Sequence, residues 1–132
     1  MADEKIKFSF EYYDCSGKYC LSEWDKNEIK KSLERLKDIN TKSFNDLIRQ
    51  RSAYHFYEID WNKCVERGFP DKRANTLSPF HFSLVGINNQ KARVFGAYQA
   101  NIFYIVWFEL WKSHYDSALI QGKEKLKVVL FK

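Results

Sequence analysis

Apolar and polar residues alternate along residues 5–13. The even-numbered positions are the apolar ones: Ile6, Phe8, Phe10 and Tyr12. Successive side chains of an extended chain point to opposite faces, so a period of two is typical of a strand with one buried face. The pattern predicts a half-buried strand at residues 5–13, followed by a turn at residues 14–17.

After Ser22 the apolar residues recur every three or four positions. Ser22 and Asp25 resemble a capping box, in which a hydroxyl group accepts from the third backbone N–H of a helix. The apolar positions that follow predict one buried helical stripe: Ile29, Leu33, Leu36 and Ile39. Ser43 and Asp46 repeat the capping pattern and predict a shorter helix that ends near Arg51. Because the link between the helices is short, we expect an antiparallel helical hairpin.

The middle of the chain, residues 52–79, has no clear period. We expect a short extended segment at residues 54–61 and then a loop, because polar residues and both prolines follow. Strands rich in β-formers are predicted after it, at residues 80–87, 91–99 and 102–110. Short links, such as Ala100–Asn101, make these strands antiparallel.

This order of elements predicts a single α+β domain over residues 1–132, with the order β-α-α-β-β-β. A helical hairpin would pack on one face of a twisted antiparallel sheet and leave the other face open. The strand at 102–110 is apolar on both parities, so part of that open face must also be covered or bind something. Residues 117–132 are expected to form a C-terminal extension of the domain.

Charge is distributed unevenly along the chain, whose net charge is +5. Residues 1–25 carry three lysines and six acidic residues, whereas residues 26–51 carry eight basic and four acidic residues. Residues 111–132 carry five lysines and two acidic residues. Segregated positive charge favours an acidic partner such as nucleic acid. Solvated lysines on helix faces are an equal alternative.

The composition limits which cellular compartment and which metal chemistry can be expected for this protein. Three cysteines, an odd number, favour a reducing compartment. Cys15 and Cys20 are loosely spaced for a zinc knuckle and lack a fourth cysteine or a nearby histidine, so we expect no metal and no cofactor. The N-terminus is charged, and the longest uncharged apolar run, residues 100–108, is too short to span a membrane. We therefore expect a cytoplasmic protein with no membrane partner.

Residues on either side of the most apolar strand carry a resemblance to a known family. Lys91-Ala92-Arg93 lies on the second of the three strands, and His114-Tyr115 follows the third. With the order of elements and the basic charge, residues 5–116 resemble the RelE/ParE toxin superfamily, and its YoeB-type ribosome-dependent mRNA interferases in particular. The resemblance implies a RelE-like fold and metal-independent cleavage of mRNA.

The resemblance also implies roles for individual residues. Arg93 would hold the scissile phosphate, and His114 or Tyr115 would protonate the leaving 5′ oxygen. A carboxylate or a lysine would help the 2′-OH attack, and Glu58 is the candidate because of its place before the three strands. The chain departs from the family in its longer loop at residues 62–79, its few strand lysines and the seventeen residues after Tyr115.

The chemistry of RNA cleavage agrees with such a set. Attack by a 2′-OH needs a base, a cation for the phosphorane and an acid for the leaving oxygen, and Arg93 offers a bidentate cation. The basic candidates for contacts to RNA are Lys30, Lys31, Lys37, Arg49, Arg51 and Lys91. Tyr98, Tyr104 and Trp111 are candidates for stacking on bases. Counted along an antiparallel pair, Arg93 and His114 lie roughly 15 Å apart, so a bend after Glu109 would be needed.

Each candidate also has a purely structural interpretation. Arg93 stands between apolar neighbours and would extend along the sheet edge to solvent. His114 and Tyr115 would be solvated loop residues, and Glu58 would belong to a solvated strand face. His55 and His81 lie in aromatic surroundings and are expected to be packing residues.

Two functional hypotheses follow. The first is a metal-independent mRNA endoribonuclease of a toxin–antitoxin or defence system, acting on the ribosome and neutralised by an antitoxin or another protein that covers its basic face. The second is a non-catalytic protein- or nucleic-acid-binding module on the same fold, which would bind through its aromatic sheet face or form a homodimer. A fold shared by toxins of different activity does not decide between them.

Overall fold

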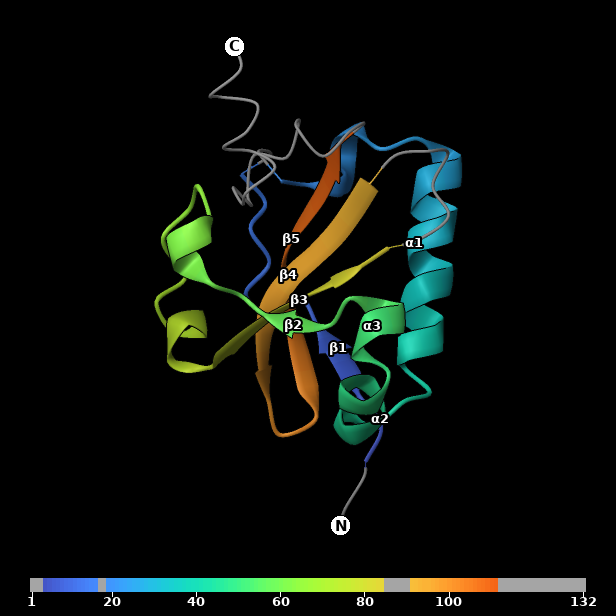
Figure 1. Cartoon of the computed structure of the whole chain (residues 1–132). Coiled ribbons are helices and arrows are strands. Elements are labelled where there is room, and N and C mark those ends of the chain that lie inside the picture. The colour runs from blue at the N-terminus through green and yellow to red at the C-terminus, as the bar shows by residue number, and fades with distance from the viewer. Residues whose placement is uncertain (1–3, 17–18, 85–90, 112–132) are drawn as a thin grey trace, which may run out of the picture.

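The computed structural model describes residues 4–16, 19–84 and 91–111, and these form a mixed sheet with helices on one side (Figure 1). In chain order the strands and helices are β1 (Lys7–Ser9), α1 (Lys26–Ile39), α2 (Phe44–Arg49), α3 (Arg51–Tyr54), β2 (Tyr57–Glu58), β3 (Ser78–Ser83), β4 (Lys91–Gln99) and β5 (Ile102–Trp111). Single 3-10 turns lie at Leu21–Glu23, Trp61–Lys63 and Ala74–Thr76. The expected extension at 117–132 lies outside the described residues.

The α+β class is confirmed, but the sheet is mixed rather than wholly antiparallel. Its strand order is β1-β5-β4-β3-β2, and β1 runs parallel to β5 while the other pairs are antiparallel. A parallel pair needs a long crossover, and the chain between β1 and β5 supplies one. The short extended segment expected before residue 61 is present as the edge strand β2.

The turn between β4 and β5 fixes their register. Ala100 and Asn101 have φ of 52° and 68°, the left-handed conformation that a two-residue hairpin of matching twist requires. Farther along the pair, the register shifts between Phe95 and Gly96, so that Val106 is an extra residue on β5. The backbone groups around this bulge bond outside the sheet: Asp14 N–H donates to the Val106 carbonyl, and Phe108 N–H donates to the Tyr19 carbonyl.

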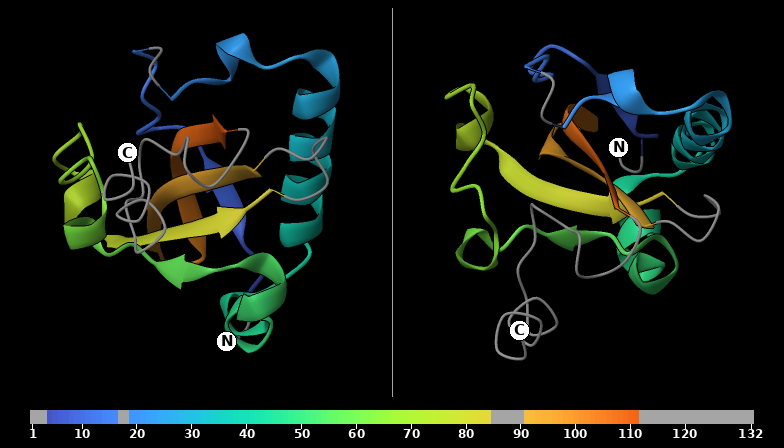
Figure 2. Two further views of the ribbon diagram at one scale, coloured as in Figure 1. Left: turned by 45° about the horizontal axis from the view of Figure 1, so that its top comes forward. Right: turned by 90° about the horizontal axis from the view of Figure 1, so that it is seen from above.

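Helices cover the first face of the sheet. The core there unites Leu36 and Ile39 of α1, Leu47 of α2 and Tyr54 of α3 with aromatic residues of the strands, including Phe82 and Phe103. Figure 2 shows α1 along this side of the sheet. The expected helical hairpin does not form along its full length, because α2 is only about 9 Å long and α1 about 21 Å.

Two details of α1 differ from expectation. Its capping box is made by Asp25 and Glu28, not by Ser22 and Asp25: Glu28 N–H donates to Asp25 Oδ1 and Asp25 N–H to Glu28 Oε1. The buried face follows Glu28, Ser32, Leu36 and Ile39, so the predicted stripe is wrong at Leu33, which is 59% exposed. Capping satisfies Glu28, and Ser32 donates to the Glu28 carbonyl, which lets polar side chains lie on this face.

Residues 59–77 cover the second face, which we expected to be largely open. Ile59, Cys64, Phe69 and Ala74 pack there with Tyr19 against the strand residues Phe95, Ala97, Val106 and Trp107. The Trp107 ring lies 5.3 Å from the Phe69 ring, and its Nε1–H donates to Asp14 Oδ2. The apolar side chains of β5 that point to the second face are therefore covered by another segment of the same chain, residues 59–77 (Figure 2).

Candidate functional site

Arg93 and Glu109 stand directly opposite each other on β4 and β5. Arg93 is half-buried, and Glu109 is only 4% exposed. Both lie close to Cys64 of the covering segment. Burial raises the pKa of the Cys64 thiol to about 11, with a further upward effect from Asp60 and Glu109 and a downward effect from Arg93 and Arg67. A carboxylate this deep needs compensating partners, and the guanidinium across the strand pair is placed to supply one.

An aromatic row runs beside this pair on the same face. Tyr57 of β2 stands opposite His81 of β3, and His81 stands opposite Phe95 of β4. The His81 ring lies 5.5 Å from the Phe95 ring and 6.4 Å from the Tyr57 ring. His81 is therefore a packing residue, as expected. His55 is not: it is exposed and ends α3 in the left-handed conformation.

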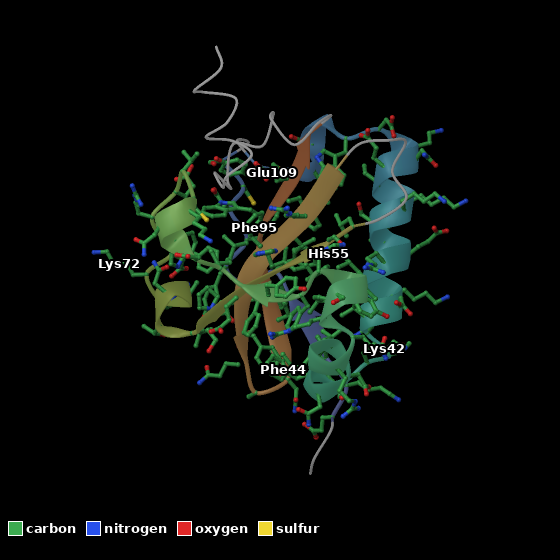
Figure 3. All side chains as sticks on the ribbon, in the orientation of Figure 1. Lys42, Phe44, His55, Lys72, Phe95 and Glu109 are labelled. Carbon is green, nitrogen blue, oxygen red and sulfur yellow. The ribbon has the colours of Figure 1, made fainter. Side chains whose placement is uncertain are left out.

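A second arginine, Arg51, lies at the Tyr57 end of this row. The Arg51 guanidinium lies over the Tyr57 ring, 5.3 Å from its centre, and Tyr57 is 38% exposed. We call Arg51, Tyr57, His81, Arg93 and Glu109 the polar row; Figure 3 labels its member Glu109, with Phe95 nearby on the sheet. Within the described ranges, Arg51 Nε and His81 Nδ1 are buried without a hydrogen-bond partner. Such atoms are uncommon in a purely structural core.

The members of the polar row differ in charge, and therefore in what each could do with a bound RNA. Burial, together with smaller effects of Arg93 and His55, lowers the pKa of His81 to about 3. The imidazole is thus neutral at physiological pH and cannot hold a phosphate by charge. The planar forks of the two arginines suit phosphate oxygens. Tyr57 offers an exposed ring, and Glu109 offers a carboxylate that can accept a proton.

The structure does not bring Glu58 beside Arg93. Glu58 is exposed on β2 and stands opposite Phe80, whose side chain belongs to the first face. The carboxylate that stands opposite Arg93 is Glu109, which was not among the candidate residues. His114 and Tyr115 lie outside the described residues. His114 follows Glu109 by five residues in the chain, which agrees with the offset expected from counting along the strand pair.

The remaining basic candidates fall in three places. Lys30 and Lys37 are exposed on α1, and Lys31 of the same helix is half-buried. Arg49 is exposed on α2 and forms an ion pair with Asp46. The Lys91 backbone lies in β4 opposite Trp111. Of these, none is a member of the polar row; only Arg51 and Arg93 are.

Two of the tyrosines expected to stack on bases already stack on other rings. Tyr98 lies parallel to Phe44, with ring centres 4.4 Å apart, and Tyr104 lies against Tyr12 at 4.8 Å. The side chain of Trp111 lies outside the described part. Tyr57 is the exposed aromatic residue that the sequence did not single out, because its two-residue strand is too short to show a period.

No cluster of three or more histidine, cysteine, aspartate or glutamate side chains could hold a metal ion in the described part of the chain. Across the same residues, no helix has the length and apolarity needed to cross a bilayer. Comparisons with protein-family models, with curated proteins and with solved structures found no match to this chain. The functional argument therefore depends on the geometry of the chain itself.

Proposed function

We propose that the protein acts on RNA as a metal-independent endoribonuclease of a toxin–antitoxin or defence system, with a RelE-like fold and a place in the cytoplasm. The observation that carries the proposal is the polar row, in which Arg51 lies over the exposed Tyr57 ring on β2 and Arg93 lies two strands away on β4. A single-stranded RNA can pair its phosphates with the cations of such a surface and stack a base on its aromatic ring.

The row also supplies two of the three groups that cleavage needs. Arg93 would stabilise the phosphorane, while the Glu109 carboxylate opposite it would take the proton from the attacking 2′-OH. Because the nucleophile belongs to the RNA itself, this reaction does not require a metal-bound water. The resemblance to RelE-type toxins would give the third role, protonation of the leaving 5′ oxygen, to His114 or Tyr115.

Induced expression tests the proposal, with growth and transcript 5′ ends followed in the same cultures. The informative variants are Arg93→Lys, which keeps the charge but loses the fork, and Glu109→Gln, which keeps the shape but loses the base. We expect wild type to arrest growth and create new mRNA ends, and each variant to slow cleavage on the order of 100-fold. Arg67→Lys, an exposed arginine outside the row, is the matched control.

Circular dichroism of each purified variant would separate loss of chemistry from loss of fold. Normal growth and intact transcripts with well-expressed, folded wild type would contradict the endoribonuclease proposal. A second candidate would then take its place, namely a non-catalytic binding module on the same fold. The observation that favours this second candidate is the exposed Leu33 on α1, which lies among lysines away from the polar row.

A further inference from the structure

The outer side of α1 carries an apolar surface that the helix does not use for its own packing. Leu33 is 59% exposed at the centre of the helix, and Ile29, one turn earlier, is half-buried. Among the described residues a shallow hollow of about 440 Å³ is lined by Lys26, Ile29, Lys30, Leu33, Glu34 and Lys37. We call these six residues the α1 surface. A single exposed leucine is ordinary on a protein surface, but this one shares a hollow with Ile29 and stands inside a rim of lysines.

The rim of the α1 surface is positive. It contains three lysines, Lys26, Lys30 and Lys37, against the single acid Glu34. The lysines stand on both sides of Leu33 along the helix, at spacings that place them on one face. A partner that covers Leu33 must therefore bring negative charge to its edges and apolar atoms to its centre.

We propose that the α1 surface docks an acidic amphipathic helix of another protein. Aliphatic residues spaced three and four apart on such a helix would cover Ile29 and Leu33, while flanking glutamates or aspartates would meet the three lysines. RNA fits this surface less well. Its phosphates would pair with the lysines, but bases gain by stacking on aromatic rings, and a phosphate backbone would leave Leu33 uncovered.

The chain itself offers no better occupant. Residues 112–132 contain five lysines and two acidic residues, so their charge opposes the lysine rim. A second copy meeting α1 about a two-fold axis would place lysines against lysines. Among the acidic side chains described near the N-terminus, Asp14 accepts from Trp107, Asp25 caps α1, Glu4 accepts from Asn101 and Glu11 forms an ion pair with Arg73.

This inference goes beyond the proposed function and does not depend on it. The α1 surface lies on the helical side of the sheet, whereas Arg93 and Glu109 lie on the side covered by residues 59–77. Lys30 and Lys37 were candidates for contacts to RNA, and this inference assigns them to an acidic protein partner instead. A partner docked on α1 would hold these lysines away from nucleic acid.

The test measures binding of a fluorescein-labelled synthetic peptide to the full chain by anisotropy. The probe is about 18 residues long, with leucines on one helical face and glutamates elsewhere. We expect saturable binding that weakens as salt is raised from about 50 to 300 mM. The Leu33→Ser variant should weaken binding about tenfold, since it removes one apolar contact, and Lys30→Glu combined with Lys37→Glu should weaken it at least as much.

Matched controls keep the result specific. Val65→Ser and Lys72→Glu alter an exposed apolar and an exposed basic residue, and Lys72 lies across the molecule from α1 (Figure 3); both should leave peptide affinity unchanged. A peptide of the same composition with its leucines dispersed, and one with lysine in place of glutamate, should bind at least about tenfold more weakly.

Three outcomes would overturn the inference. One is equal binding of the ordered and dispersed peptides, and another is an affinity that does not respond to Leu33→Ser. The third is an RNA oligonucleotide whose affinity falls with Lys30→Glu and Lys37→Glu while the acidic peptide does not bind. Arg93→Lys separates the two proposals, because it should impair RNA cleavage and leave peptide affinity unchanged. Failure of the peptide with intact cleavage would remove this inference alone.

Discussion

The two faces of the sheet are built differently, although both bury aromatic residues. Regular helices cover the first face, and the polar side chains buried there, Glu28, Ser32 and Ser43, are satisfied by helix caps and a backbone carbonyl. The irregular residues 59–77 and Tyr19 cover the second face, where charged groups also gather: Arg93, Glu109 and Glu66, which accepts from the Tyr19 hydroxyl. This difference indicates that the first face holds the fold together, whereas the second gives up part of its packing to place polar chemistry.

The largest effect that tests this comparison is expected on the first face. Phe103 is 1% exposed and packs against the rings of Phe8 and Phe82, so Phe103→Ala should lower the free energy of unfolding by about 3–5 kcal/mol. Urea denaturation followed by circular dichroism measures the change. Phe10→Ala is the control, because Phe10 is 55% exposed and should cost far less. Similar costs at both positions would argue against a first-face core.

Removing only one member of the Arg93–Glu109 pair should give the next largest effect. Arg93→Leu leaves the buried Glu109 carboxylate without the cation opposite it, which should cost about 3 kcal/mol. Arg93→Leu combined with Glu109→Leu removes both charges and should cost less than Arg93→Leu alone. A double-mutant cycle by urea denaturation measures the coupling between the two side chains. Additive costs would show that the two residues do not compensate each other.

Gly96→Ala tests the bulge between β4 and β5, which brings Glu109 opposite Arg93. A Cβ atom at Gly96 would lie 2.2 Å from the Tyr104 carbonyl oxygen and 2.5 Å from Phe103 Cε1, so the strands would have to separate. We expect a loss of about 1–3 kcal/mol in the free energy of unfolding. Gly68→Ala is the matched control, because its nearest contact is the Asn75 side chain at 3.2 Å. Equal effects at the two glycines would mean that β4 and β5 have room to adjust.

The bulge also explains why the sequence did not reveal the polar row. Counted without it from the Ala100–Asn101 turn, Arg93 would face Phe108; the extra residue Val106 brings Glu109 opposite instead. Nothing in the local sequence marks Val106, because the backbone bonds that hold the bulge come from Asp14 and Tyr19, far away in the chain. The available signal was Glu109 itself, a lone acid within an apolar strand.

The regular alternation of residues 5–13 predicted a long strand, which is wrong in its length because β1 spans only Lys7–Ser9. Other elements were predicted more closely. The apolar runs of β4 and β5 and the Ser43–Asp46 capping box appear where expected. The coverage of the second face by residues 59–77 was missed, since that segment uses single residues such as Phe69 and Trp61 rather than a repeat. Leu33 was misassigned because the buried face of α1 includes the polar residues Glu28 and Ser32, which a search for an apolar stripe leaves out.

Acidification should act on the second face through His81. The pKa of His81 is about 3 in the folded chain, below its ordinary value of 6.5, because burial disfavours the imidazolium. Its contribution to stability is complete above pH 6.5 and is lost as pH falls from 6.5 towards 3, since the unfolded chain then takes the proton first. At pH 5 we expect a loss of at most about 2 kcal/mol relative to pH 7. Urea denaturation at each pH measures it.

Variants of the two histidines separate the contribution of His81 to the pH dependence of stability from that of the carboxylates. His81→Phe should remove this part of the pH dependence, because an uncharged ring remains against Phe95. His55→Gln changes an exposed histidine that is the smallest of the three causes lowering the pKa of His81, so most of the dependence should remain. The assignment fails when the pH profiles of wild type and His81→Phe run parallel.

The smallest expected effect is at Leu33, and it completes the contrast between positions that hold the fold and positions that are free for a partner. Leu33→Ser should change the free energy of unfolding by no more than about 0.5 kcal/mol, because a side chain that is 59% exposed loses little on truncation. Leu36→Ala, three residues on and 9% exposed, should cost about 2–4 kcal/mol. A large stability loss at Leu33 would mean that its side chain is buried within the chain in solution. A negligible loss, together with weaker binding of the acidic peptide, would mean that Leu33 serves a partner rather than the fold.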